Sequence, residues 1–334
     1  MVWKMQEVEK HRLPVLAVDL GGTKIMTAVI SDSGQVLAED VCPTQAAEGV
    51  SSVIERLFTA VDRLLSQNIT EISQLGGIGI AAAGAIDSGR GLITFSPNLP
   101  GWRDVPLGDM VREKYRVDVF LVNDASAAAL GEHRFGAGRG VSNLVLLTLG
   151  TGIGGGIIIN GEMYLGACGS AAEIGHMVID VNGPECACGN RGCLETLASG
   201  TAVARDAIRR ISQGEQSSLF AMVRGKIEDI TAAKVGEAAR NGDTLALDVL
   251  SRAGTYLGVG MANLVNIFNP EMIVLGGGMA EQEELFIEPA RRVVAEKAFQ
   301  VSAQAVRIVT AQLGNEAGIY GAAVFALEQV RRTE

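Results

Sequence analysis

The sequence predicts an α/β protein made of two similar halves that face each other across a cleft, with a structural metal site in the second half. Two glycine-rich hairpins about half a chain apart predict the duplication. Apolar strand-like runs alternate with helical patterns along most of the chain, as is typical of α/β folds. Three cysteines and a histidine between residues 176 and 193 predict the metal site.

Composition limits the classes of function. The chain has 334 residues and a formal net charge of −10, so it is long enough for two domains and lacks the basic surface of a nucleic-acid binder. The first residues carry scattered charges, unlike a signal peptide. The most apolar long stretch, residues 144–159, is too short to span a membrane. We therefore expect a soluble cytoplasmic protein that binds neither nucleic acid nor membrane.

The first hairpin lies in residues 13–30. Two apolar runs flank a glycine turn in the sequence Asp19-Leu20-Gly21-Gly22-Thr23-Lys24. Successive backbone N–H groups in such a turn form a nest for phosphate oxygens, and Asp19 would face a metal-bound polyphosphate. The same stretch also fits an ordinary glycine hairpin.

The second hairpin, residues 144–159, repeats this arrangement. Moving the first copy forward by 129 residues places Leu20 on Leu149 and Gly21 on Gly150. The repetition favours phosphate binding over an ordinary turn, because two such hairpins in a duplicated fold would hold one nucleotide from both sides.

Two other nucleotide-binding motifs are excluded. The glycines at 150, 152 and 155 match G-x-G-x-x-G, but that dinucleotide-binding motif requires a following helix, and residues 157–159 are three isoleucines that predict a strand. A Walker A loop is excluded because no glycine-rich turn ends in G-K-[ST].

The region between the hairpins contains two candidate polar residues. A helix is expected over 50–65 and a buried strand over 76–86. The irregular segment 96–102 contains Asn98, whose amide suits a sugar hydroxyl or caps its own turn.

A strand over 117–122 is followed by Asn123-Asp124 and a helix over 125–132. A carboxylate at the carboxyl end of a strand lies at the usual ligand-binding edge of an α/β sheet. We favour Asp124 as a catalytic carboxylate because the three histidines at 11, 133 and 176 offer no better base. The alternative is that Asp124 only caps the helix.

Helices are expected over 200–210, 230–240, 253–268 and 318–330, and strands over 272–275 and 306–310. The strand over 272–275 runs into Gly276-Gly277-Gly278, and a helix is expected after this third glycine turn. Its bare backbone would lie flat against an adenine or a ribose. The alternative is a simple loop connection.

The metal site is predicted from ligand spacing. Cys186, Cys188 and Cys193 form C-x-C-x4-C, and His176 precedes them by ten residues. Three thiolates and an imidazole complete a closed tetrahedral zinc site, which is structural rather than catalytic. Glu173 and Glu195 bracket the segment, so we expect the metal to shape a loop that holds these carboxylates. The alternative is a pair of buried cysteines plus a disulfide, or no metal at all.

These motifs together resemble the ROK family (repressors, open reading frames and sugar kinases) over nearly the full length. The matching stretches are D-L-G-G-T-K at 19–24, N-D at 123–124, G-T-G-I-G-G-G at 150–156, E-I-G-H at 173–176 and C-A-C-G-N-R-G-C-L-E at 186–195. The segment S-P-N-L-P-G-W at 96–102 is most similar to bacterial ROK glucokinases. The resemblance implies duplicated actin-like ATPase (ribonuclease H-like) domains: residues 1–123, completed by the helix at 318–334, and residues 124–317, with the zinc loop.

The resemblance also implies roles for individual residues. Asp124 matches the catalytic base that takes the proton of the sugar 6-hydroxyl. Sugar contacts are expected from Asn98, Asn123, Asp124, Glu173, His176 and Glu195, and zinc contacts from His176, Cys186, Cys188 and Cys193. Cofactor contacts are expected from Asp19, Gly21, Gly22, Thr23, Lys24, Thr151, Gly152, Gly277 and Gly278. One departure is Ala172, where family members usually have glycine; its methyl group is expected to tighten the sugar loop.

The expected reaction is the transfer of a phosphoryl group from ATP to D-glucose, with Mg²⁺ as cofactor and Zn²⁺ in a structural role. A kinase for N-acetylmannosamine or N-acetylglucosamine is a close alternative. A ROK repressor would need an N-terminal helix-turn-helix, whereas the first strand is expected near residue 14. A non-catalytic sugar sensor, polyphosphate as donor, and a homodimer or homotetramer are further alternatives that the resemblance leaves open.

Overall fold

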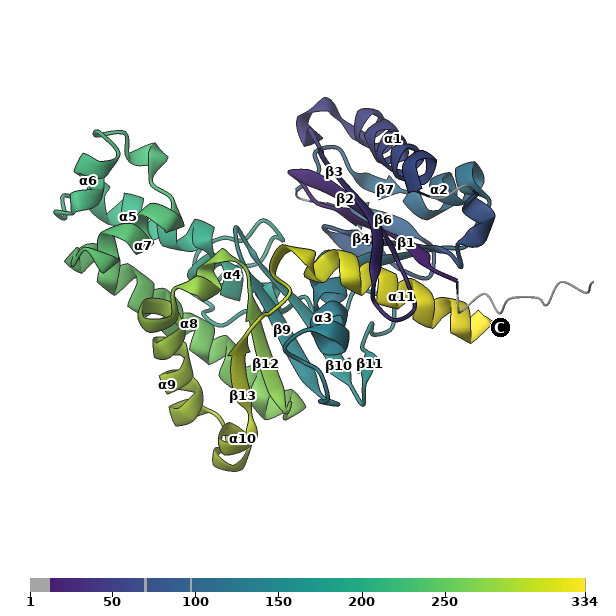
Figure 1. Ribbon diagram of the computed structural model, residues 1–334. Coiled ribbons are helices and arrows are strands. Elements are labelled where there is room, and N and C mark those ends of the chain that lie inside the picture. Colours follow the sequence, from purple (N-terminus) through teal and green to yellow (C-terminus); the bar gives the residue numbers. More distant parts are fainter. Residues whose placement is uncertain (1–12, 69–70, 97, 334) are drawn as a thin grey trace, which may run out of the picture. The chain divides into compact units, whose positions relative to one another are not determined.

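The computed structural model describes residues 13–68, 71–96 and 98–333, and they divide into two compact units. The first unit contains the described residues up to 140 together with 163–171 and 315–333, and the second contains 141–162 and 172–314. His11 lies outside the described residues. Figure 1 shows α11 (Ala317–Thr333) among the elements of the first unit, although it comes from the far end of the sequence.

The first unit is built on a five-stranded sheet with the order β3-β2-β1-β4-β8. The strands β1, β2 and β3 are antiparallel neighbours, whereas β4 and β8 continue the sheet parallel to β1. The bounds are β1 Val15–Leu20, β2 Lys24–Ile30, β3 Val36–Pro43, β4 Ile78–Ala82 and β8 Val119–Asn123. A smaller antiparallel sheet contains β5 Ala85–Asp87, β6 Leu92–Phe95 and β7 Arg103–Val105.

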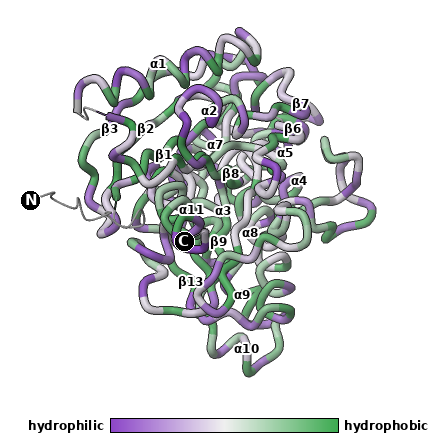
Figure 2. Tube along the Cα trace, turned by 90° about the vertical axis from the view of Figure 1, so that its right-hand side faces the viewer, coloured by the Kyte–Doolittle hydropathy of each residue, from purple (hydrophilic) through white to green (hydrophobic). Residues whose placement is uncertain are grey.

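Helices pack on the sheet of the first unit. Residues of α1 (Val50–Asn68) and α2 (Leu107–Tyr115) form a hydrophobic core with Leu16 and Val18 of β1. Side chains alternate between the faces of a strand, so Asp19 belongs to the other face, and α11 packs against β1 and β4. Figure 2 shows hydrophobic and hydrophilic residues alternating along α1, as expected for a helix with one buried side.

Helix α3 (Asp124–Phe135) lies in the first unit, although residue 124 opens the predicted second domain. Glycines explain its tight packing against α11. A side chain at Gly321 would collide with the backbone oxygen of Ala127, and one at Gly131 with that of Ala317. The two helices therefore approach each other backbone to backbone.

The second unit repeats the topology of the first, with the strand order β11-β10-β9-β12-β13. Strands β9 and β10 form the antiparallel hairpin, and β12 and β13 continue parallel to β9. The predicted duplication is confirmed by this shared strand order. The second turn is one residue shorter than the first, because Leu149 pairs with Ile153 whereas Leu20 pairs with Ile25. The bounds are β9 Leu144–Leu149, β10 Ile153–Ile159, β11 Glu162–Met163, β12 Met272–Gly276 and β13 Arg307–Thr310.

The helices of the second unit surround α8, whose buried residues join the core with those of β9 and β12. Their bounds are α4 Leu194–Ala198, α5 Gly200–Ser212, α6 Ser218–Met222, α7 Ala232–Arg240, α8 Thr244–Phe268, α9 Glu288–Lys297 and α10 Gln300–Ala305. Helix α8 begins before the predicted residue 253, because Asp243 caps it by accepting a 2.9 Å hydrogen bond from Ala246 N–H.

Short helical turns connect these elements. The 3₁₀ turns are η2 Ala46–Glu48, η3 Ile72–Gln74, η4 Ile174–His176, η5 Ile227–Asp229, η6 Gly278–Glu281 and η8 Gly314–Glu316, and η7 Glu283–Ile287 is a π-helical turn. Among the described residues, the helices are too short or too polar for any of them to cross a membrane.

Candidate functional site

The first glycine turn leaves two successive backbone N–H groups without an acceptor among the described residues. Gly21 N–H donates to Lys24 O at 3.1 Å and closes the turn. Buried Thr44 supports it, since its hydroxyl donates to Gly21 O at 2.7 Å and its N–H to Thr23 O at 2.9 Å. Within the described part of the chain, the N–H groups of Gly22 and Thr23 donate to no protein acceptor. Two successive free donors suit phosphate oxygens. The supporting role of Thr44 is not visible in the sequence, because it depends on pairing with a distant strand.

The second glycine turn has the same features. Gly150 N–H donates to Gly152 O at 3.0 Å, and the carbonyl of Gly150 accepts a 2.8 Å hydrogen bond from Gly200 at the start of α5. The N–H groups of Thr151 and Gly152 donate to no acceptor among the described residues. Each unit therefore has two such N–H groups at the equivalent hairpin.

Asp19 lies where the backbone of α11 comes close. A Cβ atom at Gly318 would lie 2.8 Å from Oδ2 of Asp19. Burial, and to a smaller extent the negative charge of Asp124, raise the pKa of Asp19 to about 6, while the positive charge of Lys24 opposes the rise. Two partly buried carboxylates that repel each other form a favourable position for a cation. The sequence analysis does not predict a role for Gly318, although the spacing of Gly318 and Gly321 in the first turns of α11 is a signal for close helix packing.

The cap of α3 is Asn123 and not Asp124. The Oδ1 atom of Asn123 accepts hydrogen bonds from Ala125 N–H and Ser126 N–H, both at 3.0 Å. The alternative that Asp124 caps this helix is therefore wrong; Asp124 is the first helical residue.

The carboxylate of Asp124 is held by one oxygen. Its Oδ1 atom accepts from Asn123 Nδ2 at 3.0 Å and from Ala125 N–H at 2.9 Å. Oδ2 has no hydrogen-bond partner in the described structure. Burial raises the pKa of Asp124, and the two hydrogen bonds oppose that rise. One fixed and one unengaged oxygen suit a carboxylate that accepts a substrate proton.

Asn123 has a positioning role. Its Nδ2 donates to Gly84 O at 3.0 Å as well as to Asp124. Both donors of its amide are therefore used within the protein. Its expected contact with a sugar remains a prediction.

Asn98 lies beside the first glycine turn. A Cβ atom at Gly22 would lie 2.8 Å from the backbone oxygen of Asn98. The loop is anchored by buried Trp102, whose backbone N–H donates to Leu99 O at 3.1 Å. The Asn98 side chain is exposed, so it remains available for a ligand.

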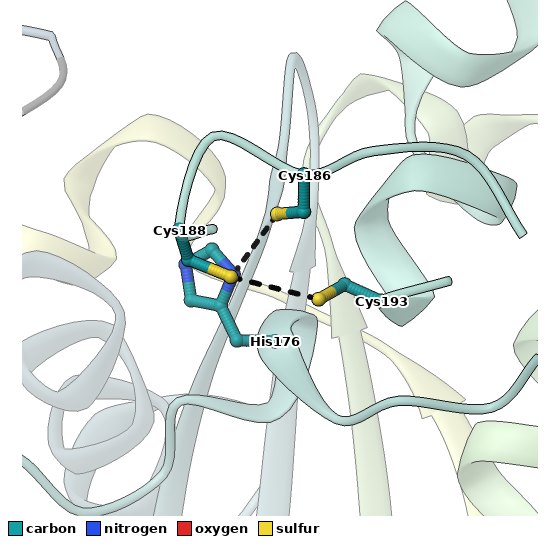
Figure 3. A group of neighbouring side chains, drawn as sticks. All are labelled: His176, Cys186, Cys188 and Cys193. Carbon is teal, nitrogen blue, oxygen red and sulfur yellow. Dashed lines mark hydrogen bonds between the residues drawn. The ribbon is translucent and has the colours of Figure 1, made fainter. Parts of the chain in front are cut away.

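Four predicted metal ligands converge in the second unit (Figure 3). The ligand atoms of His176, Cys186, Cys188 and Cys193 all lie within 4.8 Å of one another. His176 Nδ1 is 3.5 Å from Cys186 Sγ, and the sulfurs of Cys188 and Cys193 are 3.7 Å apart. Tetrahedral zinc with ordinary bond lengths requires edges of about 3.6 Å and about 3.8 Å for these pairs. All five cysteines are free thiols, so the disulfide alternative is wrong.

Backbone turns bring these ligands together. Cys186 N–H donates to Asn190 O at 2.8 Å, and Gly189 and Gly192 have φ values of 93° and 68°. Side chains at Gly192 would also collide with the backbone of Asp180. The residues therefore fit a closed zinc site, with glycine required by the conformation of its loop.

Both predicted glutamates lie beside this cluster. Glu195 Oε1 is 3.3 Å from Cys186 Sγ and 3.4 Å from His176 Nδ1. Glu173 Oε2 is 4.0 Å from Nε2, the opposite nitrogen of the same ring. His176 thus faces the cysteines with Nδ1 and has Nε2 on the side of Glu173.

The third glycine turn follows β12. Gly277 has φ 85°, and a Cβ atom there would lie 2.5 Å from Leu149 O in β9. Gly278 has open space around it. The turn leads into the 3₁₀ turn η6 rather than directly into an α-helix. An exposed glycine backbone remains available for the flat face of a nucleoside.

Ala172 has φ 68°, in the left-handed region that favours glycine. Glycine, which the resemblance to the family implies at this position, would adopt this conformation without strain. The alanine carries backbone strain immediately before Glu173.

The two units share one strand order, and each has two backbone N–H groups without a described acceptor at its first hairpin, which together define the actin-like ATPase fold. The model of the ROK family matches residues 15–329. A glucokinase of Thermotoga maritima is 38% identical over 96% of this chain and 99% of its own. A xylose repressor of Caldicellulosiruptor bescii is 32% identical over 94% of this chain and 78% of its own. The chain belongs to the ROK family.

A solved structure supports the same assignment. The ROK glucokinase of Streptomyces griseus, in complex with glucose and AMPPNP, superimposes with a TM-score of 0.79 at 35% identity, and the match covers 94% of this chain and 99% of that one.

Proposed function

We propose that this protein phosphorylates D-glucose at its 6-hydroxyl with ATP. The observation that carries the proposal is the geometry of Asp124, whose Oδ1 is fixed by two hydrogen bonds while Oδ2 has no partner among the described residues. The similarity to two glucokinases, one of them solved with glucose and an ATP analogue, supports the choice of substrates.

Asp124 orients the attacking hydroxyl and accepts its proton through Oδ2 as the new bond to phosphorus forms. The free N–H groups of the two glycine turns bind the phosphate oxygens of ATP. Asp19 and Lys24 lie at the first turn, where Asp19 would hold Mg²⁺. When bound, Mg²⁺ neutralises charge on the transferred phosphoryl group.

The remaining predicted residues serve recognition. Asn98, Glu173, His176 and Glu195 bind the ring hydroxyls, and Asn123 acts through the positioning of Asp124. Gly277 and Gly278 accommodate the nucleoside. Recognition of each hydroxyl by a hydrogen-bonding partner discriminates against sugars that lack that hydroxyl.

Zinc would be held by His176 and the three cysteines, and its role is structural because four protein ligands leave no open position. It would fix the loop that carries the two glutamates, both of which lie within 4.0 Å of His176.

A sugar-responsive regulator is the second candidate, favoured by the similarity to the Caldicellulosiruptor bescii xylose repressor. N-acetylmannosamine or N-acetylglucosamine kinases use the same kind of polar groups and differ in the space around the sugar 2-position. A panel of glucose, mannose, fructose and both N-acetylhexosamines, read by ADP release, separates these functions. Glucose should give the highest kcat/KM; absence of turnover with every sugar would favour the regulator.

Asp124→Asn tests the proposed base. The amide retains the size and most hydrogen bonds of the carboxylate but accepts no proton. We expect kcat to fall by a factor of about 10² to 10⁴, with glucose binding measured by calorimetry changed much less. Retention of most of the activity would exclude Asp124 as the general base.

A further inference from the structure

The carboxylate of Glu195 occupies the space that a side chain at Gly152 would take. A Cβ atom built on Gly152 would lie 2.8 Å from Glu195 Oε2. Gly152 is absent from the residues with left-handed φ, so its backbone conformation is open to alanine. A side chain at position 152 would therefore displace the carboxylate of Glu195.

Backbone hydrogen bonds connect the same two residues by a second route. Ser199 N–H donates to Glu195 O at 3.2 Å, and the next residue, Gly200, donates to Gly150 O at 2.8 Å. Thr201 N–H reaches Thr151 O at 3.4 Å. The segment 195–201 is thus connected to the turn 150–152 in two ways, by these backbone hydrogen bonds and by the Glu195 carboxylate that lies against Gly152.

The other oxygen of Glu195 points to the metal cluster. Oε1 is 3.3 Å from Cys186 Sγ and 3.4 Å from His176 Nδ1. The carboxylate is therefore confined from two sides, by the cluster at Oε1 and by the glycine turn at Oε2. A group that pushes the carboxylate away from the glycine turn therefore also changes its position relative to the metal cluster.

The first unit has a comparable contact. There, Gly22 of the first glycine turn lies against Asn98, so that a Cβ at Gly22 would be 2.8 Å from Asn98 O. In each unit a glycine of the turn contacts a residue expected to bind the sugar. The arrangement recurs although the contacting groups, a backbone carbonyl and a side-chain carboxylate, are unrelated in sequence.

We infer that Gly152 is a positioning residue for Glu195, and that the second glycine turn and this sugar-binding carboxylate move as one body. The inference rests on the proposed function for the identity of the ligands. Nucleotide binding at the turn would then adjust Glu195, and the affinities for nucleotide and glucose would be linked through the second unit alone.

Gly152→Ala tests this positioning role, and Gly150→Ala is the matched control. Both add one methyl group to the same turn, but a Cβ at Gly150 meets nothing within 4 Å. Glu195 is a flexible side chain, so we expect Gly152→Ala to fold and to displace the carboxylate. Its glucose Kd, measured by calorimetry without nucleotide, should rise about tenfold or more, the loss expected when a charged hydrogen-bonding partner moves. Gly150→Ala should change this Kd less than about threefold.

Zinc release provides a readout that is independent of sugar. Displacement of a carboxylate that touches two metal ligands should speed transfer of zinc to a chromogenic chelator by about tenfold in Gly152→Ala only. Wild-type zinc release together with wild-type glucose affinity in Gly152→Ala would overturn the inference. If the wild-type protein bound no glucose, the proposed function would fail, while the zinc measurement would still decide whether Gly152 positions Glu195.

A double-mutant cycle separates the contact from a general effect on the turn. Glu195→Asp withdraws the carboxylate by one methylene group. In that background Gly152→Ala should add little to the rate of zinc release, because the two residues no longer touch. Additive effects of the two substitutions would contradict the positioning role.

Discussion

Asp19→Asn should stabilise the ligand-free protein at neutral pH while removing an essential group. The folded protein raises the pKa of Asp19 from 3.8 to about 6, chiefly by burial and further through the nearby charge of Asp124. A raised pKa means that the folded state binds the proton more tightly than the unfolded state does. The associated stability is complete below pH 4 and is lost as the pH rises to about 6. Asparagine has no charge to lose, so its stability does not fall in this window.

The size of the effect follows from the two pKa values. Their difference of about two pH units corresponds to about 3 kcal/mol when both states are ionised. The carboxylate is partly accessible to solvent, so we expect about 1–3 kcal/mol at pH 7.5. About one third of this gap should remain at pH 4.5. At about 2–4 °C per kcal/mol, the melting temperature should rise by several degrees.

The assay is thermal unfolding without Mg²⁺ or nucleotide, between pH 4.5 and 8. Asp32→Asn is the control, because Asp32 is an exposed residue between β2 and β3 and the substitution changes net charge equally. The stability difference between Asp19→Asn and the wild type should grow with pH. If it did not, or if Asp32→Asn showed the same difference, the loss of stability at high pH could not be assigned to ionisation of Asp19. Excess ATP and Mg²⁺ should stabilise the wild type more than the variant, because only the wild type has the carboxylate proposed to hold the cation.

Three further predictions concern other parts of the structure. Gly321→Ala should lower the unfolding free energy, measured by urea denaturation, by about 2 kcal/mol or more. The added methyl group collides with the backbone oxygen of Ala127, which cannot move unless α3 moves. Gly89→Ala is the control and should be nearly neutral, because its Cβ meets only Asp87 Oδ1 at 3.6 Å. Ala172→Gly should raise the unfolding free energy by up to about 1 kcal/mol. Release of about 1–2 kcal/mol of strain from the left-handed conformation outweighs the added flexibility of glycine in the unfolded chain. A lower stability of this variant would show that Ala172 is not strained. The purified protein should contain one equivalent of zinc by mass spectrometry. Removal of the zinc by a chelator should raise the KM for glucose before it changes the KM for ATP. If exhaustive metal removal altered neither the glucose KM nor the stability, the link between the metal loop and sugar binding would be wrong.

Local patterns predicted the parts of the fold that depend on local chemistry. The paired hairpins were found because their apolar runs and glycine turns are continuous in sequence, and strand pairing confirms both. The metal cluster was found because its ligand spacing is short. The predicted start of this helix at residue 253 is wrong, because α8 begins at Thr244, directly after its cap Asp243.

Long-range contacts explain what the sequence did not predict. Gly318 contacts Asp19 only because α11 returns to the first sheet, and Gly152 meets Glu195 only because the metal loop folds back over the second hairpin. The spacing of Gly318 and Gly321 indicates close helix packing but not the contact with Asp19, and nothing local distinguishes Gly152 from the other glycines of its turn. The sequence left open whether Asp124 caps α3, because either Asn123 or Asp124 is a suitable cap; the structure gives this role to Asn123.

The return of α11 to the first unit has a consequence for synthesis on the ribosome. The first sheet has all its strands once residue 123 has been made, but α11, which packs on β1, β4 and α3, begins only at residue 317. At about 5–20 residues per second, the 194 residues from 317 back to 123 take roughly 10–40 seconds. Most of the second unit, residues 172–314, emerges before α11. The half of the protein that is translated first therefore completes its fold last, and its sheet face opposite α1 needs protection from other nascent chains in the meantime.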